Sequence, residues 1–386
     1  MKQRHQIYHR LRLHERLSRD DAVFLYRHAN ILEIAQLANE RRELLHGNKT
    51  YFIKNKHIDY SNVCVLSCRF CAFARKKGQD GAFENSIEQI LAKVRLGVPD
   101  GIREVHIVGG FHPTLPYAFY KDMLSSIKRE FPTIHIKAFT APEISYFSKK
   151  FRMTEEQILK DLIDCGLGSL PGGGAEIFAP RVRQEICGPK GDADGWLKTH
   201  ELAHALGLNS NATMLYGHIE TIEERVDHLA RLRDLQDKTG GFLCFIPLAF
   251  NSISRNFKVD RARAHFSHDG ETQPRQSQVS NLQGTKYEVV GITSAYDDLK
   301  IMAISRLFLD NIAHIKAYWV MAGMAVAQMA QFYGADDLHG TVIEENITHM
   351  AGGKTPQGYK ANELCRVIAA SGRVPVERDS LYREIA

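Results

Sequence analysis

Short apolar segments alternate with amphipathic helices along most of the chain, and this alternation limits the fold more than any other feature. Each apolar segment has the length of a strand that is buried on both faces, and a helical stretch separates it from the next. About eight such strand–helix units predict an α/β fold, a parallel (β/α)8 barrel of the TIM type, with an incomplete barrel as the structural alternative. The apolar segments are residues 51–63, 104–108, 135–139, 167–170, 210–215, 242–249, 312–319 and, more weakly, 341–342.

The first turns of several helices can be read directly. A Ser or Thr followed three residues later by an acidic or amide side chain is typical of a capping box, in which two otherwise unpaired backbone N–H groups are satisfied reciprocally. These pairs are Ser18 with Asp21, Thr154 with Gln157, Thr221 with Glu224 and Ser294 with Asp297, while Asn85 and Asp194 are expected to open two further helices.

The same patterns divide the chain. Residues 1–50 are expected to form an N-terminal helical extension, residues 51–350 the barrel, and residues 351–386 a C-terminal helical tail packed on the barrel. Residues 251–290 are polar and almost without periodicity. A loop of this length in a barrel is either functional or mobile, so we expect an insertion that is mobile or an ordered lid.

Composition and charge exclude several classes of protein. The 386 residues are 44% hydrophobic and 25% charged, which is enough to bury a sizeable core. The net charge of +5 is slight and is not gathered in one segment, so no nucleic-acid partner is expected. No apolar run reaches ~18 residues, so no membrane span is expected. Seven cysteines, an odd number, fit a reducing cytoplasm better than a disulfide framework.

Three cysteines stand within eight residues, directly after the first apolar segment. Cys64, Cys68 and Cys71 form a C-x3-C-x2-C run with no local fourth ligand. Because fully ligated iron–sulfur clusters take four cysteines and structural zinc sites take four ligands, three thiolates leave one metal position open for chemistry. A zinc site would need a second pair of ligands, and three ordinary core thiols would need a less polar loop. A cluster with an open iron is therefore the favoured interpretation, and we expect Phe70 to pack beside it and exclude water.

This spacing resembles the signature of the radical S-adenosylmethionine (SAM) superfamily, whose 4Fe-4S cluster binds SAM at its free iron. The resemblance gives a role to Gly109-Gly110, which ends the second apolar segment, because a Gly-Gly pair at this place holds the amino group of SAM in the family. Glycines also let backbone approach a ligand closely, although a tight turn is the alternative. Glu143 and, less firmly, Glu220 suit hydrogen bonds to SAM; a surface carboxylate is the alternative for Glu143.

Other polar residues at segment ends are candidates for the chemistry. His112 and His218 are candidate proton donors or acceptors. Arg181 and Arg183 could clamp a substrate carboxylate, although solvent-exposed arginines are commoner. Residues 172–174 are three glycines that lack the Lys-Ser/Thr of a phosphate-binding loop, which favours a loop packed closely against SAM or substrate.

The longer segments narrow the resemblance to one branch, the aminofutalosine (aminodeoxyfutalosine) synthases of menaquinone biosynthesis. The resemblance covers roughly residues 15–382 apart from 251–290, and Asn251 and the polar stretch stand where these synthases have a His-Pro-like segment and a short loop. The segments FHPTLP, HIKAFTAPEI and HIKAYW favour the synthases, whereas PGGGAEI and ATM-x-x-GH-x-ET also occur in the sister enzymes, the dehypoxanthine futalosine cyclases.

The resemblance implies a transferase that adds the 5′-deoxyadenosyl radical of SAM to the small molecule 3-[(1-carboxyvinyl)oxy]benzoate and yields 6-amino-6-deoxyfutalosine. It also implies reduced flavodoxin or ferredoxin as the electron donor. The cyclase or a deazaflavin-forming relative is the alternative within the enzymes. An electron-transfer or structural iron–sulfur protein is the alternative outside them, although a redox carrier has no need of an open iron.

Overall fold

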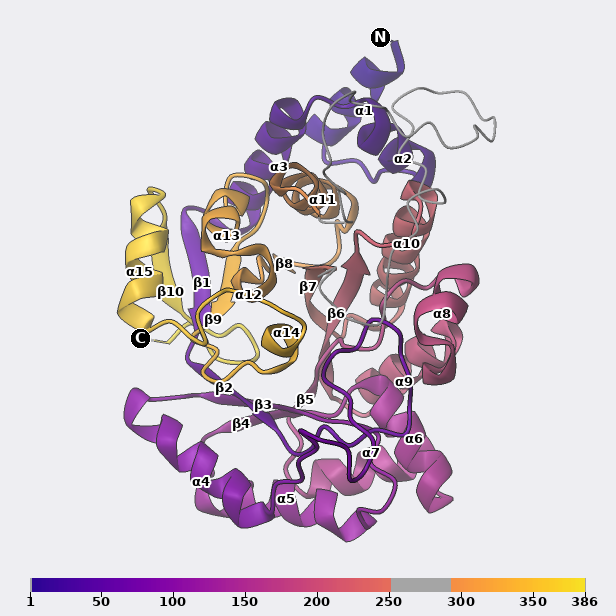
Figure 1. Ribbon diagram of the computed structural model, residues 1–386. Helices are drawn as coiled ribbons and strands as arrows, with labels where there is room; N and C mark the ends of the chain where they lie inside the picture. Colours follow the sequence, from indigo (N-terminus) through magenta and orange to yellow (C-terminus); the bar gives the residue numbers. More distant parts are fainter. Residues whose placement is uncertain (1, 251–292, 386) are drawn as a thin grey trace, which may run out of the picture.

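The computed structural model describes residues 2–250 and 293–385, and a curled sheet of parallel strands lies at its centre (Figure 1). Seven strands are hydrogen-bonded in the order β2-β3-β4-β5-β6-β7-β8, and every neighbouring pair is parallel. The predicted α/β barrel class is confirmed, in its incomplete form. The strands are β2 (Asn55–Asp59), β3 (Glu104–Val108), β4 (His135–Ala138), β5 (Ser169–Leu170), β6 (Asn209–Tyr216), β7 (Phe242–Ala249) and β8 (His314–Ile315).

A second, three-stranded parallel sheet stands between the two edges of the first. It has the order β10-β1-β9, formed by β1 (Lys49–Ile53), β9 (Asp337–Gly340) and β10 (Val374–Glu377). Single bridges between Lys316 and Asp337 and between Lys56 and Ile343 link it to both edges of the seven-stranded sheet. The apolar stretch 51–63 is therefore two strands in different sheets, and the C-terminal segment holds a strand in addition to the helix expected there.

Most of the helices lie outside the strands and surround them (Figure 1). Three of them precede β1, and of these α2 packs against α10 and α3 against α11. The apolar faces of the helices that surround the strands bury one side of the sheet. The helices are α1 (Lys2–Arg12), α2 (Arg19–His28), α3 (Ile31–His46), α4 (Ile87–Gly97), α5 (Tyr117–Glu130), α6 (Ala141–Phe151), α7 (Glu155–Asp164), α8 (Pro180–Cys187), α9 (Ala193–Ala205), α10 (Ile222–Thr239), α11 (Ala295–Phe308), α12 (Trp319–Ala322), α13 (Met324–Ala330), α14 (Ile347–Met350) and α15 (Ala361–Ala370).

The predicted capping boxes are confirmed at the starts of α2, α7, α10 and α11. Two other helix starts shift slightly. Helix α4 begins after Ser86, which forms a capping box with Gln89, rather than after Asn85. Helix α9 begins after Asp192 rather than at Asp194. The polar stretch 251–290, expected to be an insertion or a lid, lies outside the described residues.

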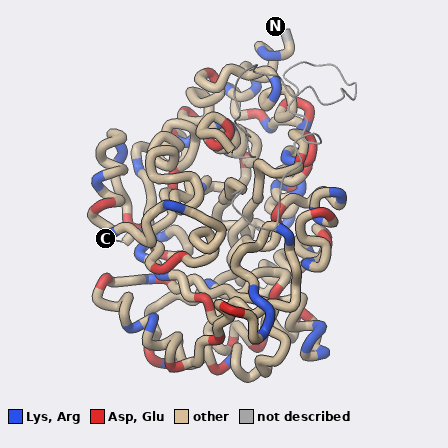
Figure 2. The backbone as a smooth tube through the Cα atoms, viewed as in Figure 1, with Lys and Arg blue, Asp and Glu red and all other residues tan. Residues whose placement is uncertain are grey.

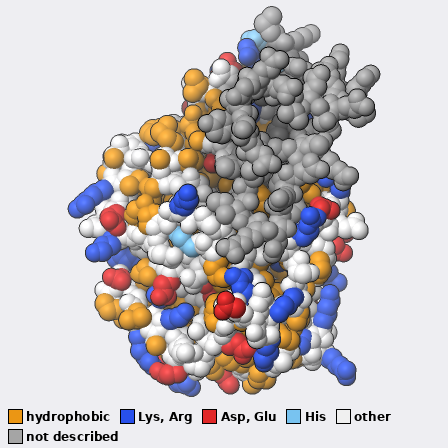
Figure 3. All heavy atoms as spheres, in the orientation of Figure 1, with side chains coloured by type: hydrophobic (Ala, Val, Ile, Leu, Met, Phe, Trp, Pro, Cys, Tyr) orange, Lys and Arg blue, Asp and Glu red, His pale blue; other side chains and the backbone are white. Residues whose placement is uncertain are grey.

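Charged residues of both signs are interspersed along the backbone around the visible circumference (Figure 2), and charged side chains of both signs are interspersed over the described part of the face in Figure 3. Within the described residues, we find no helix long and apolar enough to cross a membrane.

Candidate active site

The cysteine segment leaves the carboxyl end of β2 and is held in place by backbone and basic side chains. Cys64 N donates to the carbonyl of Arg75, and Val65 N donates to that of Phe111, 2.9 and 3.0 Å away. Lys76 Nζ donates to the carbonyls of Cys64, Val65 and Leu66 at 2.9–3.2 Å. These hydrogen bonds hold the loop without using its thiols.

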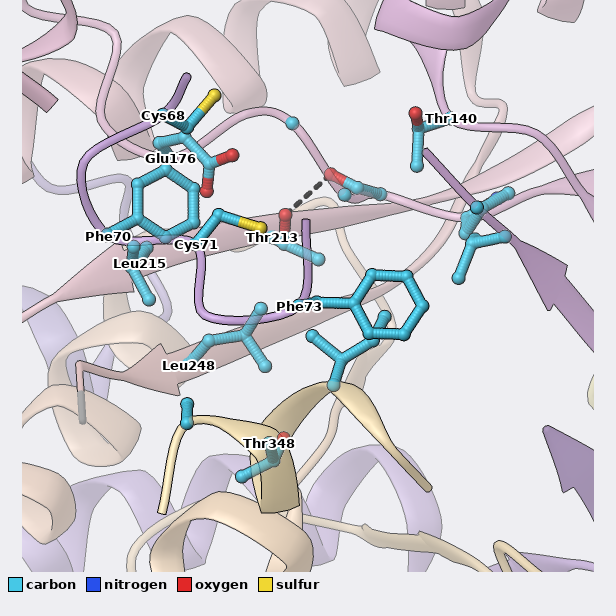
Figure 4. Close-up of a pocket in the computed structure, with 18 of the residues that line it drawn as sticks. Cys68, Phe70, Cys71, Phe73, Thr140, Glu176, Thr213, Leu215, Leu248 and Thr348 are labelled. Atoms are coloured by element: carbon cyan, nitrogen blue, oxygen red, sulfur yellow. Dashed lines mark hydrogen bonds between the residues drawn. The ribbon is translucent and has the colours of Figure 1, made fainter. Parts of the chain in front are cut away.

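The three thiols face one cavity of about 330 Å³ that opens at the carboxyl ends of the strands. None of them is in a disulfide. Cys64 is buried, Cys68 and Cys71 are partly exposed, and burial raises the pKa of the Cys68 thiol to about 11. Cys68, Cys71 and Phe70 lie on one short stretch of loop beside the cavity (Figure 4). Three free thiols on one wall fit the donor set of a cluster with an open iron.

Gly109 and Gly110 line the same cavity, beside the cysteine segment. A Cβ on Gly109 would stand 2.4 Å from the ring of Tyr60. A Cβ on Gly110 would stand 2.3 Å from the carbonyl oxygen of Val63. Only glycine fits both positions, because real Cβ atoms do not approach other atoms so closely.

Glu143 is a buried carboxylate that lines the cavity from the first turn of α6. Its Oε2 accepts from Thr140 N and Thr140 Oγ1, both at 2.7 Å, and its Oε1 accepts from the Tyr60 hydroxyl at 2.8 Å. Burial raises its pKa. The surface carboxylate considered as an alternative is therefore excluded, since Glu143 forms the capping box of α6 with Thr140.

The triple-glycine loop lines the cavity and packs closely against β6, while its predicted packing against SAM or substrate stays a prediction. A Cβ on Gly172 would stand 2.6 Å from the carbonyl oxygen of Asn211, and Thr213 Oγ1 donates to the carbonyl of Gly172 at 2.5 Å (Figure 4). Arg183, buried to 4% exposure, donates to the carbonyls of Gly174, Ala175 and Gly191. Its guanidinium holds the loop and is not free to clamp a substrate, so that alternative is wrong.

Sequence reasoning missed an ion pair at the mouth of the cavity. Lys190 Nζ lies 2.7 Å from Glu176 Oε1 and 5.6 Å from the centre of the Phe70 ring, and all three residues line the cavity. Burial alone would lower the pKa of Lys190, but the carboxylate of Glu176 and the nearby Cys68 raise it, so the ammonium stays charged. Lys190 lies in a short helical turn after α8 that no motif marks.

Two predicted catalytic residues do not line the cavity. Arg181, half exposed, forms a two-pronged pair with Glu224 at 3.0 and 2.7 Å, which ties α8 to the start of α10. His112 is buried, and its Nδ1 accepts from Thr114 N and Leu115 N. Its Nε2 lies 3.0 Å from Glu84 Oε1. These contacts hold loops, and the predicted roles of both side chains, a carboxylate clamp for Arg181 and proton transfer for His112, stay predictions.

His218 and Glu220 likewise have structural partners and do not line the cavity. Glu220 accepts from His218 N at 2.9 Å and from Arg225 Nε at 2.8 Å. Burial opposes its ionisation, but the nearby His218 and Arg225 lower its pKa to about 2. His218 uses Nε2 toward the carbonyl of Leu215 and accepts through Nδ1 from Ile219 N. The predicted roles of His218 as a proton donor or acceptor and of Glu220 as a contact of SAM therefore stay predictions.

Comparison with known proteins identifies the family. The model of the Radical SAM superfamily matches residues 58–232, and that of the CofH/MqnC C-terminal region matches residues 272–385. Aminodeoxyfutalosine synthase of Thermus thermophilus is 45% identical over 371 residues, which cover 96% of this chain and 93% of the relative. The chain belongs to the radical SAM superfamily.

Two further relatives are similar to nearly the whole chain. Aminodeoxyfutalosine synthase of Streptomyces coelicolor is 40% identical to this chain, and the similarity covers 97% of this chain and 92% of the relative. The 5-amino-6-(D-ribitylamino)uracil–L-tyrosine 4-hydroxyphenyl transferase of Methanothermobacter thermautotrophicus is 37% identical and covers 96% of this chain and 95% of its own.

Two solved structures show the same fold at low sequence identity. The FeFe-hydrogenase maturase HydG of Carboxydothermus hydrogenoformans has a TM-score of 0.67 at 17% identity, covering 98% of this chain and 80% of that one. Methylornithine synthase (PylB) has a TM-score of 0.64 at 14% identity, covering 96% and 97%. As a radical SAM enzyme, the protein uses a 4Fe-4S cluster and SAM.

Proposed function

We propose that the protein is an aminodeoxyfutalosine synthase that joins the adenosyl part of SAM to 3-[(1-carboxyvinyl)oxy]benzoate and forms 6-amino-6-deoxyfutalosine. The observation that carries the proposal is the 45% identity over nearly the full length of a relative with that name. When bound, the cluster, reduced by one electron, and SAM would supply methionine and a 5′-deoxyadenosyl radical for addition to the enol-ether double bond, and rearrangement to the product would release one carboxylate carbon. Reduced flavodoxin or ferredoxin is the proposed electron donor, and the cytoplasm the proposed location.

The chain's own residues have separable tasks in this proposal. The thiolates of Cys64, Cys68 and Cys71 would hold three irons. Gly109 and Gly110 bring backbone close to SAM, since both line the cavity and have no side chain to block it. These assignments are supported by the shared cavity wall and by the absence of space for any Cβ.

Water must be kept from the radical carbon, and apolar side chains around the cavity serve this task. Phe70, Phe73, Leu215 and Leu248 all line it and come from the cysteine segment, β6 and β7 (Figure 4). An apolar wall gives the radical no hydrogen-bonding solvent and confines the alkene, which is how proteins direct cofactor chemistry.

We expect Glu143 to contact SAM, and Thr140→Ala to weaken that contact. The variant loses the hydroxyl that donates to Glu143 Oε2 and caps α6. The free energy of unfolding should fall by about 1–2 kcal/mol, and the KM for SAM should rise. Thr154→Ala removes an equivalent cap on α7, away from the cavity, and should lower stability with no change in KM. Urea denaturation and 5′-deoxyadenosine release measure both; equal KM values in the two variants would contradict the role.

A second candidate function rests on the 37% identity to the L-tyrosine 4-hydroxyphenyl transferase. One experiment separates the two. The anaerobically reconstituted enzyme is given SAM and a reductant with either 3-[(1-carboxyvinyl)oxy]benzoate or L-tyrosine plus 5-amino-6-(D-ribitylamino)uracil, and products are identified by mass spectrometry. We expect 6-amino-6-deoxyfutalosine in the first mixture and only 5′-deoxyadenosine and methionine in the second. A coupled product in the second mixture alone would overturn the proposal.

A further inference from the structure

The inner end of the cavity is lined by basic side chains that no motif marked. His57, His106 and Lys137 lie on β2, β3 and β4 and are paired across the sheet in register, His57 with His106 and His106 with Lys137. All three line the cavity, and so does His339 in β9. We call these four residues the basic floor.

The basic floor lies well below the cysteines. His106 lies on β3, three residues before Gly109, which directly follows the strand, so it is about 10 Å deeper at the usual rise per residue. Phe70, Phe73, Leu215 and Leu248 make much of the wall above the floor apolar. The cation at the mouth, Lys190, already has the carboxylate of Glu176 2.7 Å away. An anionic group of a ligand therefore finds its complement at the floor and not at the mouth.

The basic side chains around the floor outnumber the carboxylates that pair with them. Lys137, 3% exposed, pairs with Glu104 at 2.7 Å, and Arg378 pairs with Asp337 at 2.6 Å. Lys316 is 2% exposed, and within the described part of the chain no carboxylate lies within ion-pair distance of its ammonium. Lys316 is thus a buried basic group without a paired carboxylate, and burial lowers its pKa. A neighbouring anion would favour its charged form, so the surroundings of the floor fit an anionic ligand.

The histidines of the floor can serve such a ligand as neutral donors. Burial lowers the pKa of His106 to about 4. Burial and the neighbouring His106 lower the pKa of His57, and burial and the neighbouring Lys316 lower the pKa of His339. His339 is 6% exposed, and its Nδ1 is buried without a hydrogen-bond partner in the protein. An unpaired buried donor or acceptor costs about 1–3 kcal/mol, which a ligand can recover.

The backbone and packing around His339 show that this arrangement is held in place. His339 has a φ of +72°, a conformation that side chains other than glycine rarely adopt. Its Nε2 lies 3.4 Å from His57 Nε2, and the His57 and His106 rings are 4.6 Å apart. Strained residues with unsatisfied polar atoms concentrate at ligand sites.

We propose that the basic floor binds an aryl carboxylate, the ring carboxylate of the substrate, with Lys137 as its counter-ion and the three histidines as hydrogen-bond partners. The identification of this carboxylate rests on the function proposed above. Lys137 has three donors and gives one to Glu104, so two remain for the ligand. With the ring carboxylate at the floor, the enol-ether double bond at the other end of the molecule points toward the cysteine segment.

The test compares two substrates in the reconstituted holoenzyme. One is 3-[(1-carboxyvinyl)oxy]benzoate, and the other is 2-phenoxyacrylate, which keeps the enol ether and lacks the ring carboxylate. We expect wild type to prefer the first by on the order of a hundredfold in kcat/KM, the range of a charge-assisted contact. The double variant Glu104→Gln/Lys137→Gln keeps a hydrogen-bonding pair of similar size without the charges. It should reduce the preference to within about threefold, and a preference that persists would overturn the proposal.

A binding measurement makes the test independent of turnover and of folding differences. Calorimetry with 3-methoxybenzoate should show a Kd at least about tenfold weaker in the double variant, and an unchanged Kd in Lys160→Gln, a surface control. His106→Asn should weaken binding too, and serves if the double variant does not fold. Absence of binding to wild type also overturns the proposal. If wild type binds 3-methoxybenzoate through Lys137 but makes no 6-amino-6-deoxyfutalosine, the proposed function alone is refuted. If wild type makes this product and the double variant keeps the full preference for the substrate with the ring carboxylate, the role of the basic floor alone is refuted.

Discussion

Cys68→Ala is expected to abolish cluster binding and SAM cleavage while leaving the fold intact. Turnover should fall by about three orders of magnitude or more, because the reaction's difficult step belongs to the cofactor and the protein alone does not provide it. Cys68 is the informative position of the three. It is only partly buried, whereas Cys64 is buried beside Gly110, so a change at Cys64 would mix loss of a ligand with loss of packing.

The matched control is Cys165→Ala. Cys165 is also partly exposed, but it lies at the end of α7 and does not line the cavity. Iron and sulfide per chain, the visible absorption of the reconstituted protein and release of 5′-deoxyadenosine measure the outcome, and circular dichroism checks the fold. We expect a full cluster in the control and none that survives desalting in Cys68→Ala. A stable cluster that cleaves SAM in Cys68→Ala would remove Cys68 from the ligand set.

The residues that could be predicted from sequence are those whose chemistry is written in local spacing. Cys64, Cys68 and Cys71 stand within one turn of loop, and the Gly109-Gly110 pair ends an apolar segment, so neither needs knowledge of distant contacts. The structure brings all five to one cavity wall. Barrel topology explains why, since the carboxyl ends of parallel strands meet at one end of the sheet.

Polar residues at segment ends were less predictable, because many of them hold helix starts and loops. Thr140 and Glu143 have the three-residue spacing of a capping box, a signal in the sequence that identifies the structural part of the role of Glu143. Arg181 alone suggests a clamp for a substrate carboxylate, because no sequence pattern marks its ion-pair partner Glu224, which lies far along the chain. Ion pairs between distant elements leave no local pattern.

The basic floor illustrates the opposite difficulty. His57, His106 and Lys137 lie within parallel strands, where burial on both faces favours apolar side chains. Each of them by itself looks like a single polar exception in an apolar segment. Only the strand register shows that they stand side by side across three strands. Polar side chains in the interior of a predicted parallel strand are costly to bury. Such residues on neighbouring segments are therefore the signal to seek.

Gly110→Ala is expected to displace the cysteine segment and thereby prevent stable cluster binding. The new Cβ would stand 2.3 Å from the carbonyl oxygen of Val63 and 3.0 Å from Cys64 Cβ. The first of these is a backbone atom, which no side-chain rotation can move aside. Hydrogen bonds from Gly110 N to the carbonyl of Ser61 at 2.8 Å and from Val65 N to that of Phe111 join the two segments on either side of the clash. The segments must therefore separate, and Cys64 moves with its backbone.

The free energy of unfolding of Gly110→Ala should fall by about 1–3 kcal/mol, the usual cost of overpacking, and iron content should fall much further than stability does. Gly188→Ala is the matched control, because nothing lies within 4 Å of its added Cβ and its φ of −41° suits alanine. Chemical denaturation and iron analysis of both variants after the same reconstitution decide the matter. We expect the clash in the cavity wall to affect the cluster by displacing Cys64. Normal iron content in a destabilised Gly110→Ala variant would contradict this expectation. It would show that the cysteine segment adapts and that Gly110 serves packing alone.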